Sequence, residues 1–376
     1  MLRAFKYRLY PNKRTEKKLL ETLEICRLVY NKILETKKTV YETDKKSLSK
    51  FACNDLIAKW KEDDLILSGV HSQVLQNVSD RISKAFDGFF RRVKAGEKEV
   101  GYPRFKSYGR YDSFTFPQSG FEIKADKRKN VLRLSKIGDV RIVYHRQIEG
   151  VVKTCNIRKS SSGKWYATFS CELPDVEIKQ IVENPIGVDR GLNQLVALSN
   201  GDSVSAPRFY RKSEQDLDRL NQKLSACGKG TPERKEAKKR LSLLHEKIAN
   251  KRSDFNHHVS KQLARNFDFI TFEDLSVSQM AKNHRFAKSI YDAAWTQLVQ
   301  YTTYKAVEAG GGVVLVDPRY TSQICSSCGV KEKKTLNERW HECDCGLSID
   351  RDHNAAINIL RLGLQSLEAP NFSCGE

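Results

Sequence analysis

The chain has 376 residues, which is enough for two or three domains with a substantial core. Lysine and arginine number 66 against 46 aspartate and glutamate residues, so the formal net charge is +20. A charge of this size favours a polyanionic partner, because each neutralised phosphate releases counterions. No apolar run is long enough to span a membrane, and the N-terminus lacks the apolar core of a signal peptide. We therefore expect no membrane partner and a cytoplasmic protein, which would associate with the nucleoid if its polyanionic partner is DNA.

The first hundred residues predict one strand followed by a helical block. Residues 2–10 alternate in polarity and end at Pro11, which is typical of a strand. Apolar side chains then recur at helical spacing over about 15–40, 48–60 and 71–95. These periodicities predict a helical lobe over residues 15–96.

The pattern changes to a period of two between about 100 and 180. Four short segments alternate as strands do, at 113–117, 131–134, 140–143 and 164–170. Ser162-Gly163 fits a hairpin turn before the last of them. We predict a barrel-like β domain over 1–14 and 97–182, with the helical lobe inserted into it.

A third domain is predicted over 183–318 and 347–365. Buried strands are expected at Ile186–Asp189, at Phe269–Glu273 and at about 311–316, with a hairpin around Asn200-Gly201. Two basic helices form a hairpin over 208–252, and a further helix is expected at about 289–309. An insertion over 319–346 interrupts this domain, and residues 366–376 are predicted to be a flexible tail.

Three acidic residues of this domain are candidate metal ligands. Asp189 and Glu273 each end an apolar strand, and Asp352 opens the last helix. Three carboxylates gathered at strand ends form a hard oxygen site suited to Mg²⁺ or Mn²⁺. Two such ions about 4 Å apart can activate water and stabilise the leaving oxygen of a phosphodiester. Asp274 and Asp350 are the competing neighbours, although any single strand-end acid is usually an ordinary solvated residue.

Four cysteines in two tight pairs form a second candidate site. Cys325 and Cys328 are spaced C-x-x-C, and Cys343 and Cys345 are spaced C-x-C. Two such pairs can complete a tetrahedral Zn²⁺ shell, which would make the zinc structural because no coordination position is left open. His341 is an alternative to one of the thiols, because the second pair is tighter than usual.

The C-terminal motif of the chain resembles that of a known family. It reads Tyr-Thr-Ser-Gln-x-Cys-x-x-Cys-Gly, then Cys-x-Cys-Gly-x-x-x-Asp-Arg-Asp-x-Asn-Ala-Ala, over residues 320–356. With Phe5–Asn12, Gly101–Lys106, Ile186–Gly191 and Phe272–Leu275, it resembles TnpB, the insertion-sequence-encoded ancestor of compact type V CRISPR effectors. The resemblance implies an α+β multidomain fold. It would contain a wedge-type β-barrel with an inserted helical recognition lobe, then a RuvC/RNase H-like nuclease interrupted by a zinc ribbon.

The implied activity is RNA-guided DNA cleavage. A transposon-derived guide RNA would pair with double-stranded target DNA beside a short adjacent motif, and one monomer per RNA would cut it. The resemblance carries the catalytic roles onto Asp189, Glu273 and Asp352. Helix 71–92 also carries glutamines, which can read adenine edges, although surface placement is the commoner role for each. Gln73, Gln76 and Thr115 are therefore candidates for reading the adjacent motif.

Two other functions remain open from the sequence. An RNA-independent transposase with an RNase H-like core also uses three carboxylates and two metal ions, although its usual order is Asp-Asp-Glu. A non-catalytic nucleic-acid-binding regulator would need the positive charge but not the acids.

Overall fold

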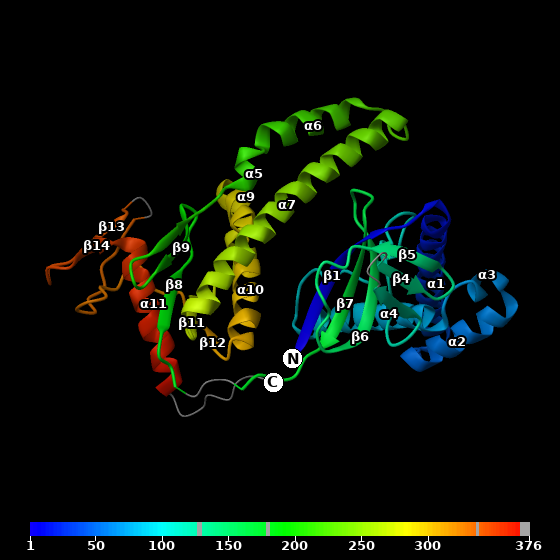
Figure 1. The fold of residues 1–376 in the computed structure, drawn as a ribbon, viewed down its shortest axis with the longest axis horizontal. Helices are drawn as coiled ribbons and strands as arrows, with labels where there is room; N and C mark the ends of the chain where they lie inside the picture. Colours follow the sequence, from blue (N-terminus) through cyan, green and yellow to red (C-terminus); the bar gives the residue numbers. More distant parts are fainter. Residues whose placement is uncertain (126–129, 178–180, 336–337, 369–376) are drawn as a thin grey trace. The chain divides into compact units, whose positions relative to one another are not determined.

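The computed structural model describes residues 1–125, 130–177, 181–335 and 338–368. The chain divides into two compact units, Met1–Asp175 and Val176–Glu376. Figure 1 shows the fold of each unit, and the two are described separately below.

A seven-stranded antiparallel sheet forms the centre of the first unit, in the order β2-β6-β7-β1-β5-β4-β3. The N-terminal strand β1 (Leu2–Tyr10) lies between β7 and β5, so it joins the later strands as its alternation predicted. The other strands are β2 (Ser113–Phe116), β3 (Phe121–Ala125), β4 (Asn130–Leu134), β5 (Gly138–Ile142), β6 (Val151–Lys159) and β7 (Trp165–Glu172). Strands β3 and β6 were not predicted.

The sheet of the first unit is curled. Its two edge strands, β2 and β3, follow one another in the chain and are joined only by residues 117–120. A link this short cannot cross a flat seven-stranded sheet, because neighbouring strands are about 4.8 Å apart. The edges therefore approach one another, and the rings of Phe116 and Phe121 lie 6.3 Å apart.

The helical block of the first unit shares one hydrophobic core with this sheet. It consists of α1 (Lys13–Asp44), α2 (Lys50–Asp63), the short α3 (Leu65–Ser68) and α4 (Ser72–Lys94). The side chains of Asn12 and Ser49 cap α1 and α2 by accepting backbone N–H bonds. Leu19 of α1, Val74 of α4 and Trp165 of β7 belong to the same buried cluster.

The second unit contains a five-stranded mixed sheet in the order β10-β9-β8-β11-β12. Strands β8 (Pro185–Asp189), β11 (Phe269–Glu273) and β12 (Gly312–Val316) run parallel. Strands β9 (Gln194–Leu198) and β10 (Ser203–Ser205) form the expected hairpin, in which Gly201 has a φ of +93° that favours glycine. The small strands β13 (Trp340–Glu342) and β14 (Ser348–Asp350) form a separate hairpin.

The helices of the second unit cover both faces of this sheet (Figure 1). Ile186, Val188 and Phe272 pack with Val259 of α7 and Leu298 of α10 on one face. Residues that alternate with them face α11, where a Cβ on Gly187 would lie 2.1 Å from the Ala356 carbonyl oxygen. The helices are α5 (Phe209–Lys212), α6 (Glu214–Ala226), α7 (Pro232–Asn266), α8 (Val277–Met280), α9 (His284–Ala293), α10 (Trp295–Glu308) and α11 (Arg351–Glu368).

Three segments of the second unit differ from their predicted extents. The helix expected at 289–309 is two helices, α9 and α10, because Ala294 between them adopts a left-handed φ of 52°. Helix α7 continues beyond 252 to Asn266, since Val259 and Leu263 belong to the core. The predicted tail begins with the end of α11, and its residues 369–376 lie outside the described residues. Among the described helices, none has the length and apolar character that a membrane crossing requires.

Candidate active site and metal centre

The parallel strands β8 and β11 bring Asp189 and Glu273 to the same edge of the sheet. Phe272 pairs with Val188, so the next residue of each strand is an acid. Side chains alternate between the faces of a strand, so Asp189 lies on the face of Gly187, and Glu273 lies on the face of Thr271. That face is covered by α11, where a Cβ on Gly363 would lie 2.1 Å from the Thr271 hydroxyl.

Helix α11 places Asp352 beside these two acids. Asp350 caps the helix, because its Oδ1 accepts the backbone N–H groups of Asp352 at 2.9 Å and His353 at 3.1 Å. The carboxylate of Asp352 is not used in this cap, and its Oδ2 lies 3.9 Å from the Cβ position of Gly191, two residues after Asp189. The structure therefore brings together the three acids that the sequence singled out.

The competing acids occupy different environments. Asp274 is exposed, whereas Glu273 beside it retains only 7% of its accessible surface. Asp350 is engaged as the helix cap.

The electrostatics of the cluster disfavour negative charge. Burial raises the pKa of Asp189 well above its usual value, and the carboxylates of Glu273 and Asp352 raise it further. Burial also raises the pKa of Glu273, although the Thr321 hydroxyl and the Arg190 guanidinium oppose this. A cation placed among these carboxylates would relieve their repulsion.

Two residues that the sequence analysis missed support Glu273. Thr321 Oγ1 donates a 2.5 Å hydrogen bond to Glu273 Oε1. Arg190 is buried, donates a hydrogen bond to the backbone carbonyl of Glu273, and lies over the Phe272 ring at 5.5 Å. Burial lowers the pKa of Arg190 to about 10, although nearby carboxylates raise it. Arg190 directly follows a strand-end acid and Thr321 lies in the C-terminal motif, but neither position by itself indicates a contact with Glu273.

The four predicted cysteines form one compact group. Their sulfur atoms all lie within 4.8 Å of one another, with 3.7 Å between Cys325 and Cys345 and 3.5 Å between Cys328 and Cys343. Four sulfurs at this spacing fit a tetrahedral Zn²⁺ site. His341 is fully buried but is not a member of the group, so the all-cysteine set accounts for the geometry better than the histidine alternative.

The environment of Cys325 favours the thiolate that metal binding requires. Burial by itself would raise its pKa, but hydrogen bonds from the backbone of Cys328 and from the backbone of Ser327 lower it to about 5. A thiol with a lowered pKa releases its proton readily to a metal ion.

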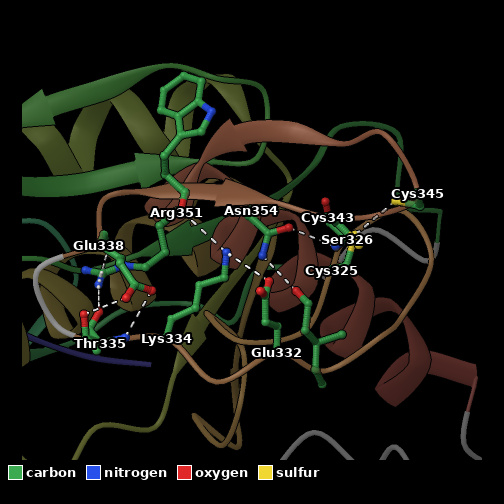
Figure 2. A network of polar contacts seen from close by, with 12 residues as sticks. Cys325, Ser326, Glu332, Lys334, Thr335, Glu338, Cys343, Cys345, Arg351 and Asn354 are labelled. Atoms are coloured by element: carbon green, nitrogen blue, oxygen red, sulfur yellow. Dashed lines mark hydrogen bonds and ion pairs between the residues drawn. The ribbon is translucent and has the colours of Figure 1, made fainter.

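Two asparagines of α11 attach the loop that carries Cys325 and Cys328 to the acid-bearing helix. Figure 2 shows Asn354 beside Ser326, whose backbone N–H donates to Asn354 Oδ1 at 2.9 Å. Asn354 and Asn358 both donate to the Ile324 carbonyl, at 2.8 and 2.7 Å. Asn358 also donates to the Thr321 carbonyl at 2.9 Å. The cysteine group and the acids are therefore held by the same helix.

The three candidates for DNA reading lie in the first unit. Gln73 Oε1 accepts hydrogen bonds from the backbone and side chain of Ser119, at 3.0 and 3.1 Å. Thr115 Oγ1 accepts from Arg81 at 3.0 Å and from Asn156 at 2.8 Å. Gln76 is exposed on α4. Gln73 and Thr115 thus have structural partners, and Gln76 has the freest side chain of the three.

Three family models match the chain. One described as "Cas12f1-like, TNB domain" matches residues 295–359, and one described as "Probable transposase" matches residues 168–284. A third, described as a helix-turn-helix domain, matches residues 1–46, which here form strand β1 and the single helix α1.

Sequence relatives settle the family. A Streptomyces pristinaespiralis protein named as an RNA-guided DNA endonuclease is 33% identical over 382 aligned positions, covering 100% of this chain and 91% of the relative. The chain belongs to the TnpB family. Another relative of this TnpB chain is the Escherichia coli K12 protein named RNA-guided DNA endonuclease InsQ, 30% identical over 100% of the chain and 94% of the relative.

The α+β fold of this TnpB chain resembles that of a compact CRISPR effector. A solved Cas12f1–sgRNA–target DNA complex contains a chain that matches with a TM-score of 0.58 at 13% identity. The match covers 96% of the TnpB chain and 98% of the Cas12f1 chain. At this identity the likeness concerns the fold alone, with its curled sheet and its zinc-ribbon-like cysteine group.

Proposed function

We propose that this TnpB protein is an RNA-guided DNA endonuclease. The observation that carries the proposal is the convergence of Asp189, Glu273 and Asp352 at one edge of the second sheet, beneath α11. Relatives that match the whole chain bear the name of this activity. The net charge of +20 suits partners that are RNA and double-stranded DNA.

The proposed architecture follows the family. The strand order β10-β9-β8-β11-β12, with acids ending β8 and β11, supports assigning the second unit to a RuvC/RNase H-like nuclease. The cysteine group lies in the chain between β12 and α11, which supports a zinc ribbon inserted into the nuclease. The curled sheet and the helical block of the first unit would correspond to the wedge-type barrel and the recognition lobe.

The carboxylate cluster fits divalent magnesium or manganese. Its donors are hard oxygens, and burial together with the neighbouring carboxylates raises the pKa of Asp189, a cost that a bound cation would offset. Asp189, Glu273 and Asp352 would hold the ions. When bound, two such ions supply activation of the attacking water and stabilisation of the leaving oxygen in phosphodiester cleavage.

The side chains around the acids have distinct tasks in this proposal. Thr321 orients the Glu273 carboxylate through its hydroxyl, and Arg190 fixes the end of β11 through the Glu273 carbonyl. Asp350 holds the first turn of α11, which fixes where Asp352 projects. The four cysteines would bind one structural Zn²⁺, which would stabilise the insertion that Asn354 attaches to the same helix.

For the guide RNA and the adjacent DNA motif, we propose roles but no established contacts. We propose that base pairing to the RNA selects the target and that Gln73, Gln76 and Thr115 remain the candidates for reading the adjacent motif. Because Gln73 and Thr115 hold structural partners, Gln76 is the first of the three to test.

Co-purification followed by cleavage tests the function. The protein is expressed with its flanking genomic DNA, the bound RNA is sequenced, and the complex is incubated with a plasmid that carries the matching target. We expect one abundant RNA and Mg²⁺-dependent cutting. Asp189→Ala, Glu273→Gln and Asp352→Ala should each retain the RNA and lose cleavage. Asp216→Asn, an exposed acid on α6, is the matched control and should cut normally.

Two outcomes would favour the alternatives. DNA-end joining by RNA-free protein would support the RNA-independent transposase. Specific nucleic-acid binding that no acid variant alters, without cleavage under any metal condition, would support a non-catalytic regulator.

A further inference from the structure

The segment from Gly101 to Arg110, which we call the aromatic strap, connects α4 to β2. It contains three aromatic residues and three cationic residues but no acidic residue. It includes the Gly-Tyr-Pro-Arg-Phe-Lys motif, to which the nuclease site of the second unit gives no role. Apart from a turn near its end, it has no regular secondary structure.

The aromatic strap is fixed to the helices by specific contacts. Asn31 of α1 accepts from the Lys106 backbone N–H at 2.8 Å and donates to the Lys106 carbonyl at 3.0 Å. Arg27 also donates to that carbonyl, at 2.9 Å. At the other end, the Tyr102 ring makes edge contacts with Phe86 and Phe89 of α4, at 5.4 and 5.3 Å between centroids. The strap is thus held in place without pairing to a sheet.

The rings of this anchored segment remain exposed to solvent. Tyr102 retains 41%, Phe105 retains 50% and Tyr108 retains 83% of its accessible surface. Phe90 of α4, whose ring lies within 6.2 Å of Phe86, retains 57%. Single exposed apolar residues are ordinary, but several exposed rings in one short segment mark an interaction surface.

Positive charge accompanies the rings. Lys38 Nζ of α1 lies 5.2 Å from the Tyr102 ring centroid and 5.1 Å from that of Phe105. Arg104 and Arg110 form no ion pair with any described residue. The surface therefore combines exposed aromatic faces with cations whose charge is not neutralised by the protein.

We propose that the aromatic strap binds unpaired nucleotides of a single nucleic-acid strand by stacking bases on Phe105 and Tyr108. Exposed rings can stack only on bases that are not already stacked in a duplex, while nearby cations contact the phosphates. An apolar protein partner fits less well, because it would bury the charges of Arg104 and Arg110 without a counter-charge. The inference rests on the proposed function for the presence of such a strand, although it does not depend on the carboxylate site.

Binding of short labelled oligonucleotides to the full-length, RNA-free protein tests this proposal. The probes are a 12-nucleotide oligo(U) RNA, a 12-nucleotide oligo(dT) DNA and a 12-base-pair RNA duplex. We expect Tyr108→Ala to weaken binding of at least one single strand by about fivefold or more, which is the lower end for loss of one stacked base. Tyr108→Trp should retain binding, and the duplex should be unaffected.

A matched control separates stacking from general surface effects. Phe51 of α2 is 75% exposed and lies outside the strap, so Phe51→Ala should leave all three affinities unchanged. Because Tyr108 is so exposed, its replacement should not alter the melting temperature. If Tyr108→Ala binds only the RNA single strand more weakly, the guide is the source of the strand. If it binds only the DNA single strand more weakly, the source is an unwound target strand.

Several results would overturn the proposal. One is that Tyr108→Ala and Phe105→Ala both bind the single-stranded probes as tightly as wild type. Another is that Tyr108→Ala weakens binding of the duplex as much as binding of the single strands. A third is a variant that loses only self-association or the capture of a protein. The proposed nuclease function can fail separately, because stacking on the strap would persist in a protein that never cleaves DNA.

Discussion

Thr321 and Glu273 join the cysteine-bearing insertion to the acid cluster. The Thr321 hydroxyl donates to the Glu273 carboxylate at 2.5 Å, and the Thr321 carbonyl accepts from Asn358 of α11 at 2.9 Å. One residue at the start of the insertion thus contacts both the strand and the helix that supply acids. Disturbing the insertion should therefore disturb the acids, even though no cysteine is expected to take part in the chemistry.

We expect Thr321→Val to slow target cleavage by about tenfold or more, because a hydrogen bond to a charged group contributes roughly 1.5–3 kcal/mol. Thr321→Ser retains the hydroxyl and should cleave at close to the wild-type rate. The measurement is single-turnover cleavage by preassembled protein–RNA complex at saturating Mg²⁺. Valine and serine variants with equal rates would show that the contact does not orient Glu273.

Asp189→Asn should stabilise the protein in Mg²⁺-free buffer near neutral pH. The folded-state pKa of Asp189 is raised by burial and by neighbouring carboxylates, so between the unfolded and the folded pKa the folded state binds more protons than the unfolded state. Stability is therefore lost as pH rises from the unfolded pKa, about 3.9, through the raised folded pKa. Because asparagine cannot ionise, the variant does not lose this stability as the pH rises.

Thermal melts of zinc-loaded wild type and Asp189→Asn, without Mg²⁺, check this expectation. The variant should melt about 2 °C or more above wild type at neutral pH, and the difference should shrink towards pH 4. Adding Mg²⁺ should raise the wild-type melting temperature more than that of the variant. A variant that melts below wild type at neutral pH would contradict the inference that the ionised Asp189 carboxylate destabilises the folded protein.

Cys328→Ser should remove bound zinc and lower the melting temperature by about 4 °C or more, because a structural metal site contributes folding free energy. Elemental analysis should find about one zinc per wild-type chain, the number that a single four-cysteine shell holds. Cys227→Ser is the control, since that thiol lies at the end of α6, outside the group of four. Equal zinc content in both variants would refute the assignment.

Gly363→Ala tests the packing of α11 against β11. Replacing a helical glycine by alanine usually stabilises a helix by about 1 kcal/mol. Here the added Cβ would lie 2.1 Å from the Thr271 hydroxyl, so we expect lower stability and slower cleavage as α11 moves away from the sheet. Gly88→Ala in α4 has open space around the new Cβ and should be neutral or stabilising. Gly363→Ala should therefore have a lower melting temperature and a slower cleavage rate than Gly88→Ala.

Local patterns predicted the elements whose signals lie within a few residues. Strands β8 and β11 are apolar runs that end in acids, and the cysteine pairs have spacings that a metal requires. Strands β3 and β6 carry charged or polar residues between their apolar ones and were not predicted, and their pairing partners in the sheet stabilise them. The break at Ala294 also has no local signal, since alanine favours helix.

Residue type and spacing in the sequence were enough to predict the kind of chemistry, the family signature and the candidate acids and thiols, because they limit which metals can bind. Tertiary structure decided which acids meet and what supports them. Asp350 is a helix cap and Asp352 faces the cluster only because α11 packs against Gly187 and Thr271. The contacts of Arg190 and Thr321 with Glu273 join residues 48 or more positions apart, and such contacts depend on chain folding that no local pattern encodes.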